Sequence, residues 1–381
     1  MIQTGSKELI RDINTQLILK TLIEEGATSR ASLAERLHLT KATISAIVQI
    51  LLEKGLVREI GSREDAPRGR KPILLEIERN CAYIISVDLG TDTATFLTAN
   101  LMGDIVFSKT VENHETAETV LPFLIRHIAM AKASIPVCRY GLAGISVGIH
   151  GIVHKNHVVF VPYSSYQNID FQGILETAFL VPVMVDNEAN LSVLGEWAFC
   201  YHSPNMLSIS VHSGIGLGII IENRLITGQN GFAGEFGHTI LEMDGRPCPC
   251  GNRGCLEQYA SVRVLLREFS EVKGKAASAE DLFLAYQEND GDAIYIVNRF
   301  VRYMTVSISN LLTIFNPDII VLNSTFTNHL PELTKQIQGN LKNRMSPYCR
   351  LLPSALKDQA ILLGGVYRCS YMFLGLTENG R

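Results

Sequence analysis

The segment from Gly234 to Tyr259 constrains this chain most, because it brings four soft metal ligands close together in the sequence. Nine, one and four residues separate successive candidates, and turn-forming Gly and Pro residues lie between them. The four candidates are His238, Cys248, Cys250 and Cys255. One imidazole and three thiolates complete a tetrahedral shell around zinc and leave no open position for a catalytic water. The spacing therefore predicts a structural zinc knuckle, and it disfavours both ordinary free thiols and a zinc-dependent hydrolase.

Residues 1–79 predict a separate, mostly helical module. Apolar residues recur at helical spacing over 7–25, and Ser29 and Thr40 are suitable N-caps for two further helices. The short turn His38–Leu39 separates the second helix from the third. This order of elements indicates a helix-turn-helix.

A β-hairpin of the wing type is expected after the third helix. The stretches 56–60 and 73–77 alternate apolar and polar residues, which is typical of strands. Between them lies a loop rich in Arg, Gly and Pro that suits DNA phosphates or a minor groove. Residues on the polar side of the third helix suit base edges in a major groove. The candidate DNA contacts are Lys41, Thr43, Ser45 and Gln49 of this helix and Arg68, Arg70 and Lys71 of the loop.

The charge distribution supports a nucleic-acid partner for this module. Residues 1–79 hold 13 Lys plus Arg against 11 Asp plus Glu, whereas the remainder holds 21 against 27. Only residues 1–79 carry a net positive charge and are suited to a polyanion, and their surplus of positive charge is modest. Specific affinity for double-stranded operator DNA therefore calls for a homodimer or higher homo-oligomer that presents two modules. A small helical protein-interaction domain is the alternative interpretation of this region.

The metal segment resembles the signature of the ROK family, which comprises bacterial sugar kinases and related sugar-responsive repressors. The family motif G-H-x9-C-x-C-G-x2-G-C-x-E is matched at every position, by Gly237, His238, Cys248, Cys250, Gly251, Gly254, Cys255 and Glu257. The resemblance implies a two-lobed α/β fold of the actin and hexokinase type after the winged helix-turn-helix. It places the first lobe at 80–200 and the second lobe, with the zinc motif, at 201–358. The C-terminal helix, 359–381, is expected to pack back onto the first lobe.

The nucleotide motifs of the kinases in this family are altered here. In the first phosphate turn the second Gly of the kinase motif is Thr91 and its Thr is Asp92, whose carboxylate repels a triphosphate. The kinase general base Asp corresponds to Glu188, and Asn323 is among the side chains that replace glycines of the adenosine loop. These changes predict a protein that is not an enzyme and does not bind ATP. The alternative is an ATP-dependent sugar kinase, which Asp88, a second glycine-rich loop and the carboxylate of Glu188 would still serve.

By resemblance, the family's sugar contacts fall on Asn187, Glu188, Glu235, His238 and Glu257. His238 would serve twice, because one ring nitrogen can bind the metal while the other faces the sugar. Asn187 and Glu188 are also a suitable capped start of a helix, and the two roles are compatible. The resemblance thus predicts a sugar-responsive transcriptional regulator, most simply a repressor of a carbohydrate-utilisation operon with xylose or a similar sugar as inducer. The opposite response, in which the sugar promotes DNA binding, stays open.

Composition and patterning point to a cytoplasmic protein. The N-terminus is polar and charged, and no uninterrupted apolar run approaches the length of about twenty residues that spans a bilayer. Neither a signal peptide nor a membrane span is therefore expected. The cysteines outside the metal segment are scattered among apolar neighbours, which suits free thiols in a reducing compartment better than a disulfide framework.

Overall fold

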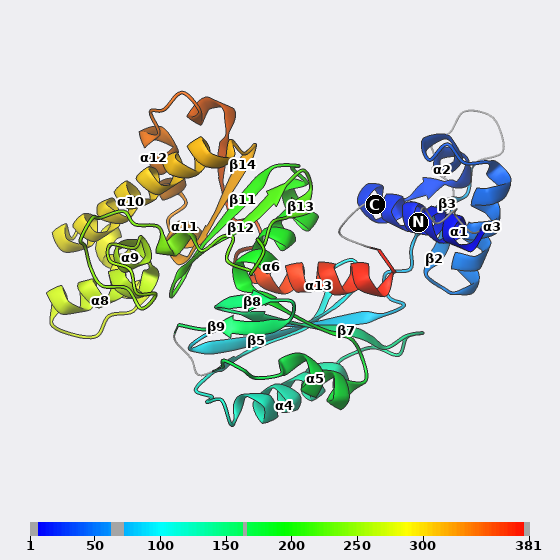
Figure 1. The fold of residues 1–381 in the computed structure, drawn as a ribbon, viewed down its shortest axis with the longest axis horizontal. Helices are drawn as coiled ribbons and strands as arrows, with labels where there is room; N and C mark the ends of the chain where they lie inside the picture. The colour runs from blue at the N-terminus through cyan, green and yellow to red at the C-terminus, as the bar shows by residue number, and fades with distance from the viewer. Residues whose placement is uncertain (1–6, 62–71, 163–165, 377–381) are drawn as a thin grey trace.

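The computed structural model describes residues 7–61, 72–162 and 166–376. Figure 1 shows a small, mostly helical body at the N-terminus and two larger α/β lobes, each built on one five-stranded sheet. The helical body lies beside the end of the C-terminal helix α13 (Ala360–Phe373) (Figure 1). Within the described ranges, no helix is both long enough and apolar enough to cross a membrane.

The N-terminal body has the predicted winged helix-turn-helix arrangement. Its helices are α1 (Lys7–Glu25), α2 (Arg30–Arg36) and α3 (Lys41–Glu53), and its sheet has the order β1 (Thr28–Ser29), β3 (Leu74–Ile77), β2 (Val57–Ile60). Both predicted N-caps are confirmed. The hydroxyl of Ser29 accepts a hydrogen bond from the backbone N–H of Ser32 at 3.1 Å. The hydroxyl of Thr40 accepts one from the backbone N–H of Thr43, also at 3.1 Å.

Only half of α1 packs into the core of this body. Ile18 and Leu22 are buried against α3 and the sheet, as their spacing predicts. The apolar residues of the first half, Ile10, Ile13 and Leu17, are between 40% and 54% exposed. The apolar side of α1 therefore extends beyond the surface against which it packs in this chain.

The first lobe is a mixed sheet with helices on both faces. Its strands have the order β10 (Val183–Asn187), β7 (Leu142–Ile149), β4 (Tyr83–Leu89), β5 (Thr93–Asn100), β6 (Ile105–Glu112). The strands β4, β7 and β10 are parallel, whereas β5 and β6 are antiparallel to their neighbours. The helices α4 (Val120–Ala133) and α5 (Phe171–Phe179) cover one face and α13 covers the other (Figure 1). A hairpin of β8 (Ile152–His154) and β9 (His157–Phe160) follows β7.

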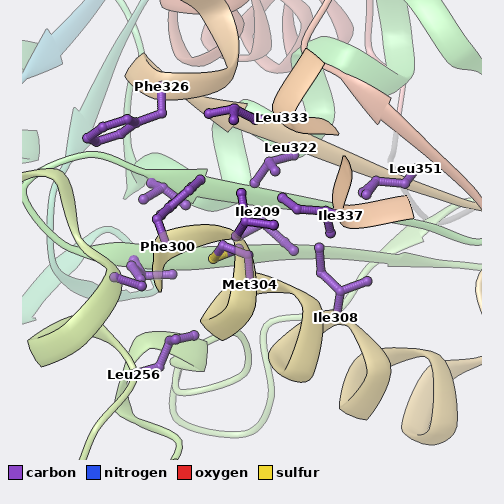
Figure 2. Packing of buried hydrophobic residues seen from close by; sticks show 14 of the residues in the cluster. Ile209, Leu256, Phe300, Met304, Ile308, Leu322, Phe326, Leu333, Ile337 and Leu351 are labelled. Carbon is purple, nitrogen blue, oxygen red and sulfur yellow. The ribbon is translucent and has the colours of Figure 1, made fainter. Parts of the chain in front are cut away.

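The second lobe packs its helices onto another mixed sheet. Its strands have the order β13 (Arg224–Leu225), β12 (Ile215–Ile221), β11 (Met206–Val211), β14 (Ile319–Ser324), β15 (Arg350–Pro353). Its α-helices are α7 (Glu257–Ala260), α8 (Val262–Lys273), α9 (Ala279–Gln287), α10 (Gly291–Phe315), α11 (Thr325–His329) and α12 (Glu332–Asn340). Figure 2 shows Phe300, Met304 and Ile308 of α10 packed beside Ile209 of β11 and Leu322 of β14.

The helices α6 (Glu188–Glu196) and α13 cross backbone to backbone between the lobes. Glycines make this approach possible. A Cβ atom on Gly364 would lie 1.8 Å from the carbonyl oxygen of Leu191. A Cβ atom on Gly195 would lie 2.2 Å from the carbonyl oxygen of Ala360. Any larger side chain at either position would force the two helices apart.

Polar contacts hold α13 in place on the first lobe. The buried carboxylate of Glu196, at the end of α6, accepts hydrogen bonds from the backbone N–H groups of Ala355 and Leu356 at 3.3 and 3.2 Å. Arg368 of α13 forms an ion pair with Asp186 of β10. The helix α13 packs on the sheet of the first lobe. It ends at Phe373, and Gly375 beyond it takes the left-handed conformation; residues 377–381 of the expected C-terminal segment 359–381 lie outside the described ranges.

Gly364→Ala is expected to destabilise the protein, because the added Cβ has no room against the backbone of α6. Overpacking typically costs about 1–3 kcal/mol, and the free energy of unfolding from urea denaturation should fall by at least that amount. Gly339→Ala in α12 is the matched control, since a Cβ there meets nothing within 4 Å. This variant should raise the free energy of unfolding by up to about 1 kcal/mol, because Ala favours a helix more than Gly does. Equal stabilities of the two variants would contradict the close packing.

Candidate functional site

The predicted metal ligands converge in the second lobe. One ligand atom from each of His238, Cys248, Cys250 and Cys255 lies within 4.8 Å of the other three. The Nδ1 atom of His238 is 3.5 Å from Cys248 Sγ, and the sulfurs of Cys250 and Cys255 are 3.7 Å apart. Sulfurs around a tetrahedral zinc with bonds of about 2.3 Å are separated by roughly 3.8 Å. The donor set and its spacing are therefore compatible with a zinc site.

Burial makes bare thiolates unfavourable in this cluster. Cys248 and Cys255 are buried, whereas Cys250 is exposed. Burial raises the pKa of Cys248, and it raises the pKa of Cys255 together with the neighbouring thiols. A divalent cation reverses this preference, because a coordinated thiol gives up its proton. The chemistry of the donors thus agrees with their geometry in favouring a bound cation.

A cavity of about 60 Å³ adjoins the metal cluster. All five residues that the resemblance assigns to the sugar line it, namely Asn187, Glu188, Glu235, His238 and Glu257. The Nε2 atom of His238 lies 3.7 Å from Glu235 Oε2, whereas its Nδ1 atom faces the sulfur of Cys248. Glu257 is buried, and its Oε1 atom lies 3.6 Å from the same sulfur. The metal cluster and the cavity therefore share one wall.

Asn187 caps α6 and also lines the cavity. Its Oδ1 atom accepts hydrogen bonds from the backbone N–H groups of Ala189 and Asn190 at 2.8 and 3.2 Å. Its Nδ2 atom donates to Glu188 Oε2 at 2.7 Å and to the carbonyl oxygen of Gly151 at 2.8 Å. The predicted helix cap is confirmed, and it fixes the direction in which the Glu188 carboxylate points.

Three carboxyl groups line the cavity, and the pKa values of two of them, Glu235 and Glu188, are raised. Burial raises the pKa of Glu235 to about 7, and the charges of Glu188 and Glu257 add to the rise. Burial also raises the pKa of Glu188. A hydroxyl that donates a hydrogen bond to such a group stabilises its charged form, because it replaces lost solvation. The cavity is thus suited to an uncharged ligand with several hydroxyl groups.

The sequence analysis missed His150, which follows β7 and lines the same cavity. Its Nε2 atom lies 2.8 Å from Asp88 Oδ1 at the end of β4. Burial lowers the pKa of His150, but the charge and hydrogen bond of Asp88 outweigh burial and raise the pKa to about 9. A second imidazole at the cavity, His212, has its pKa lowered by burial. The sequence does place His150 directly after a strand, as it places Asp88 at the end of another. Because the ends of neighbouring parallel strands meet at one edge of a sheet, this placement could have identified His150.

The described candidate DNA contacts lie on α3. Lys41, Ser45 and Gln49 are exposed and recur every four residues, so they share one side of the helix. Thr43 is only partly exposed, and its hydroxyl lies 2.9 Å from that of Thr40 at the helix cap. Thr43 therefore belongs to the start of the helix and not to the exposed side. The wing candidates Arg68, Arg70 and Lys71 lie outside the described residues.

Two family models match this chain in sequence. The ROK family model matches residues 84–369. The chain belongs to the ROK family. A second model, described as winged helix-turn-helix DNA-binding, matches residues 11–58. Together they confirm the predicted α/β architecture, in which a winged helix-turn-helix is followed by a two-lobed actin and hexokinase-like fold.

Relatives extend over nearly the whole chain of this ROK protein. The xylose repressor of Bacillus spizizenii is 33% identical over 371 residues, which cover 94% of this chain and 95% of that protein. A solved ROK family transcriptional regulator, a homologue of the Escherichia coli MLC protein, has a TM-score of 0.81 at 24% identity and covers 96% of this chain and 97% of its own. The ROK family glucokinase from Streptomyces griseus has a TM-score of 0.67 at 24% identity and covers 74% of this chain and 98% of its own. Both structures share the fold.

Asp88→Asn is expected to bring the pKa of His150 from about 9 to below its ordinary value of 6.5, because burial then outweighs the remaining charges. An NMR titration of the imidazole protons measures this directly. The pair stabilises the folded state fully below pH 6.5, and its contribution is lost as the pH rises through about 9.

Glu112→Gln is the control for this titration, because Glu112 lies in an exposed pair with His114. It should leave the titration of His150 unchanged. A His150 that titrates alike in Asp88→Asn and in the unmodified protein would contradict the ion pair.

Proposed function

We propose that this ROK protein is a sugar-responsive transcriptional repressor of a carbohydrate-utilisation operon, with xylose or a similar sugar as inducer. One observation carries the proposal: a polar cavity lined by Asn187, Glu188, Glu235, His238 and Glu257 in a chain that also carries a winged helix-turn-helix. Relatives named xylose repressor, which extend over nearly the whole chain, support the choice of function and of sugar.

The side chains of the cavity suit the hydroxyl groups of a monosaccharide. Glu188, Glu235 and Glu257 supply acceptor oxygens, and His238 supplies a ring nitrogen that faces away from the metal ligands. A sugar hydroxyl both donates and accepts, so a ring of hydroxyls can satisfy several of these groups together. Ligand sites usually have volumes of about 300–1,000 Å³, whereas this cavity measures about 60 Å³. The lobes must therefore part to admit the sugar and close around it.

The metal is proposed to be structural Zn²⁺, held by His238, Cys248, Cys250 and Cys255. Four protein ligands leave no position for a reacting water. Zinc on Nδ1 of His238 would leave Nε2 directed toward Glu235 and the cavity, 3.7 Å away in this structure. The metal would thus set both the tautomer and the direction of a sugar-binding side chain.

The module 1–79 is proposed to bind double-stranded operator DNA, and the lobes 80–200 and 201–358 to bind the sugar. Lys41, Ser45 and Gln49 would contact the major groove, with Thr43 near the phosphates at the helix start. Arg68, Arg70 and Lys71 are the proposed contacts of the wing. Two such modules on a two-fold operator call for a homodimer or a higher homo-oligomer.

Kinase activity is the alternative, and we propose that it is absent and that ATP is not bound. The Asp88 carboxylate at the first phosphate turn is paired with His150, and Thr91 and Asp92 follow it. The amide of Asn323 donates to the carbonyl oxygen of Lys357 at 3.0 Å, so a side chain bridges the loop where family kinases have glycine. Glu188 also replaces the kinase base. Each change favours sugar recognition without phosphoryl transfer.

The sugar signal is proposed to reach DNA through α6 and α13. The start of α6 lines the cavity, and α6 packs against α13. Beyond α13, the carbonyl oxygen of Gly375 accepts a hydrogen bond from Gln16 of α1 at 2.7 Å. At a second attachment point, Tyr140 donates to the carbonyl oxygen of Lys54, which follows α3, at 2.7 Å. Closure of the lobes would move both attachment points and release the operator.

Xylose is expected to reverse binding of the zinc-loaded protein to DNA from upstream of its own gene, measured by fluorescence anisotropy. Glu188→Gln should bind this DNA normally but need about 10–100 times more xylose for release, because a hydrogen bond to a charged group contributes about 1.5–3 kcal/mol. Glu112→Gln, an exposed change outside the cavity, is the control and should respond like the unmodified protein. Absence of DNA binding, or sugar-dependent formation of ADP, would favour the kinase instead.

Cys255→Ser is expected to abolish stoichiometric zinc binding and to lower the midpoint of thermal unfolding, because metal binding and folding of this segment are coupled. Metal analysis by mass spectrometry and circular dichroism measure the two effects. Cys138→Ser is the control, since Cys138 lies outside the cluster and has its sulfur 4.0 Å from the carbonyl oxygen of Gly141. One zinc per chain in both variants would exclude Cys255 as a ligand.

A further inference from the structure

A second and larger cavity, of about 420 Å³, lies where the winged helix-turn-helix meets the hinge between the lobes. Its volume falls within the range of about 300–1,000 Å³ that is usual for small-molecule sites. It is lined by residues of α1, of α13 and of the π-helix η1 (Trp197–Tyr201), which directly follows α6. The cavity is separate from the sugar cavity, because the two have no lining residue in common.

Aromatic side chains form much of its wall. Trp197 and Tyr367 meet edge to face with ring centroids 5.8 Å apart, and Tyr367 is 4.2 Å from the ring of Tyr371. Phe199 lies against Gly103, where an added Cβ would come within 2.6 Å of its ring. These rings are held by packing before any ligand arrives. A flat aromatic molecule can stack on such walls without reordering them.

The polar groups of the lining indicate the rest of the ligand's chemistry. The two charged residues of the lining, Lys20 and Glu24, form an ion pair with each other at 3.7 Å. The lining therefore offers no unbalanced charge from these two residues to a charged ligand.

The cavity lies between the helix that leads from the sugar cavity and the winged helix-turn-helix. The π-helix η1 continues α6, whose first turn carries the cap Asn187 and the cavity residue Glu188. Single π-turns inside helices are rare and frequently lie at functional sites. Across the cavity from η1, Lys20, Ile23 and Glu24 belong to α1 of the winged helix-turn-helix. A molecule in this cavity therefore contacts both η1, which continues the helix that starts at the sugar cavity, and α1 of the winged helix-turn-helix.

We propose that this cavity is a second effector site, which binds an uncharged planar aromatic molecule. Binding there fixes α1 against η1. The site does not depend on the proposed sugar, zinc or DNA contacts.

The dye Prodan, an uncharged naphthalene ketone, is a suitable probe, and Trp197 is a built-in reporter because it is the one Trp of the chain. Titration of the full-length protein should give saturable quenching of Trp197 and a blue-shifted dye emission, at one dye per chain. Ala198→Phe fills the cavity and should weaken binding at least tenfold. Ala133→Phe, at an exposed position of α4, should bind like the unmodified protein.

Quenching that does not saturate, or that Ala198→Phe leaves unchanged, would overturn the proposal. These titrations contain neither sugar nor DNA, so their failure is distinguishable from failure of the repressor function.

Discussion

The contact between α6 and α13 is the packing on which the rest of this structure depends. Gly195 and Gly364 let the two backbones approach to a distance that no larger residue permits. Packed in this way, α6 touches α13, the strands β11 and β12 of the second lobe, and β10 of the first. Its first turn lines the cavity beside His238, and its last residue, Glu196, holds the segment before α13. Close-packed interiors transmit displacement and do not absorb it, so one helix can carry a change at the cavity to distant parts of the chain.

The cluster of His238, Cys248, Cys250 and Cys255 supplies a second constraint, because it fixes the direction of an imidazole at the cavity. His238 presents Nδ1 to the thiols and Nε2 to Glu235, so the cluster and the cavity share an imidazole. Burial of Glu188 and Glu235 raises the pKa of both groups, and hydroxyl donors offset that penalty. At the other edge of the cavity His150 neutralises Asp88. The cavity is consequently suited to an uncharged ligand with several hydroxyl groups.

Local signals in the sequence predicted the helices of the N-terminal module and the candidate metal ligands, whereas the two-lobed fold was expected from family resemblance. The N-caps Ser29 and Thr40 are local, and the candidate metal ligands lie in one short segment. Contacts between distant segments could not be predicted in this way. His150 lies 62 positions from Asp88, β1 is too short to show a period, and the spacing of α1 does not reveal that its first half is exposed. The sugar-binding set came only from family resemblance, because its members lie in separate segments.

The central claim is that one equilibrium couples the sugar cavity to the winged helix-turn-helix. Coupling of this kind is reciprocal, so DNA must weaken sugar binding by the factor by which sugar weakens DNA binding. Isothermal titration of xylose into the zinc-loaded protein, alone and saturated with its operator, measures this factor from the sugar side. The account predicts weaker xylose binding in the complex, by the same ratio that anisotropy gives for DNA. Equal xylose affinity with and without DNA would contradict it.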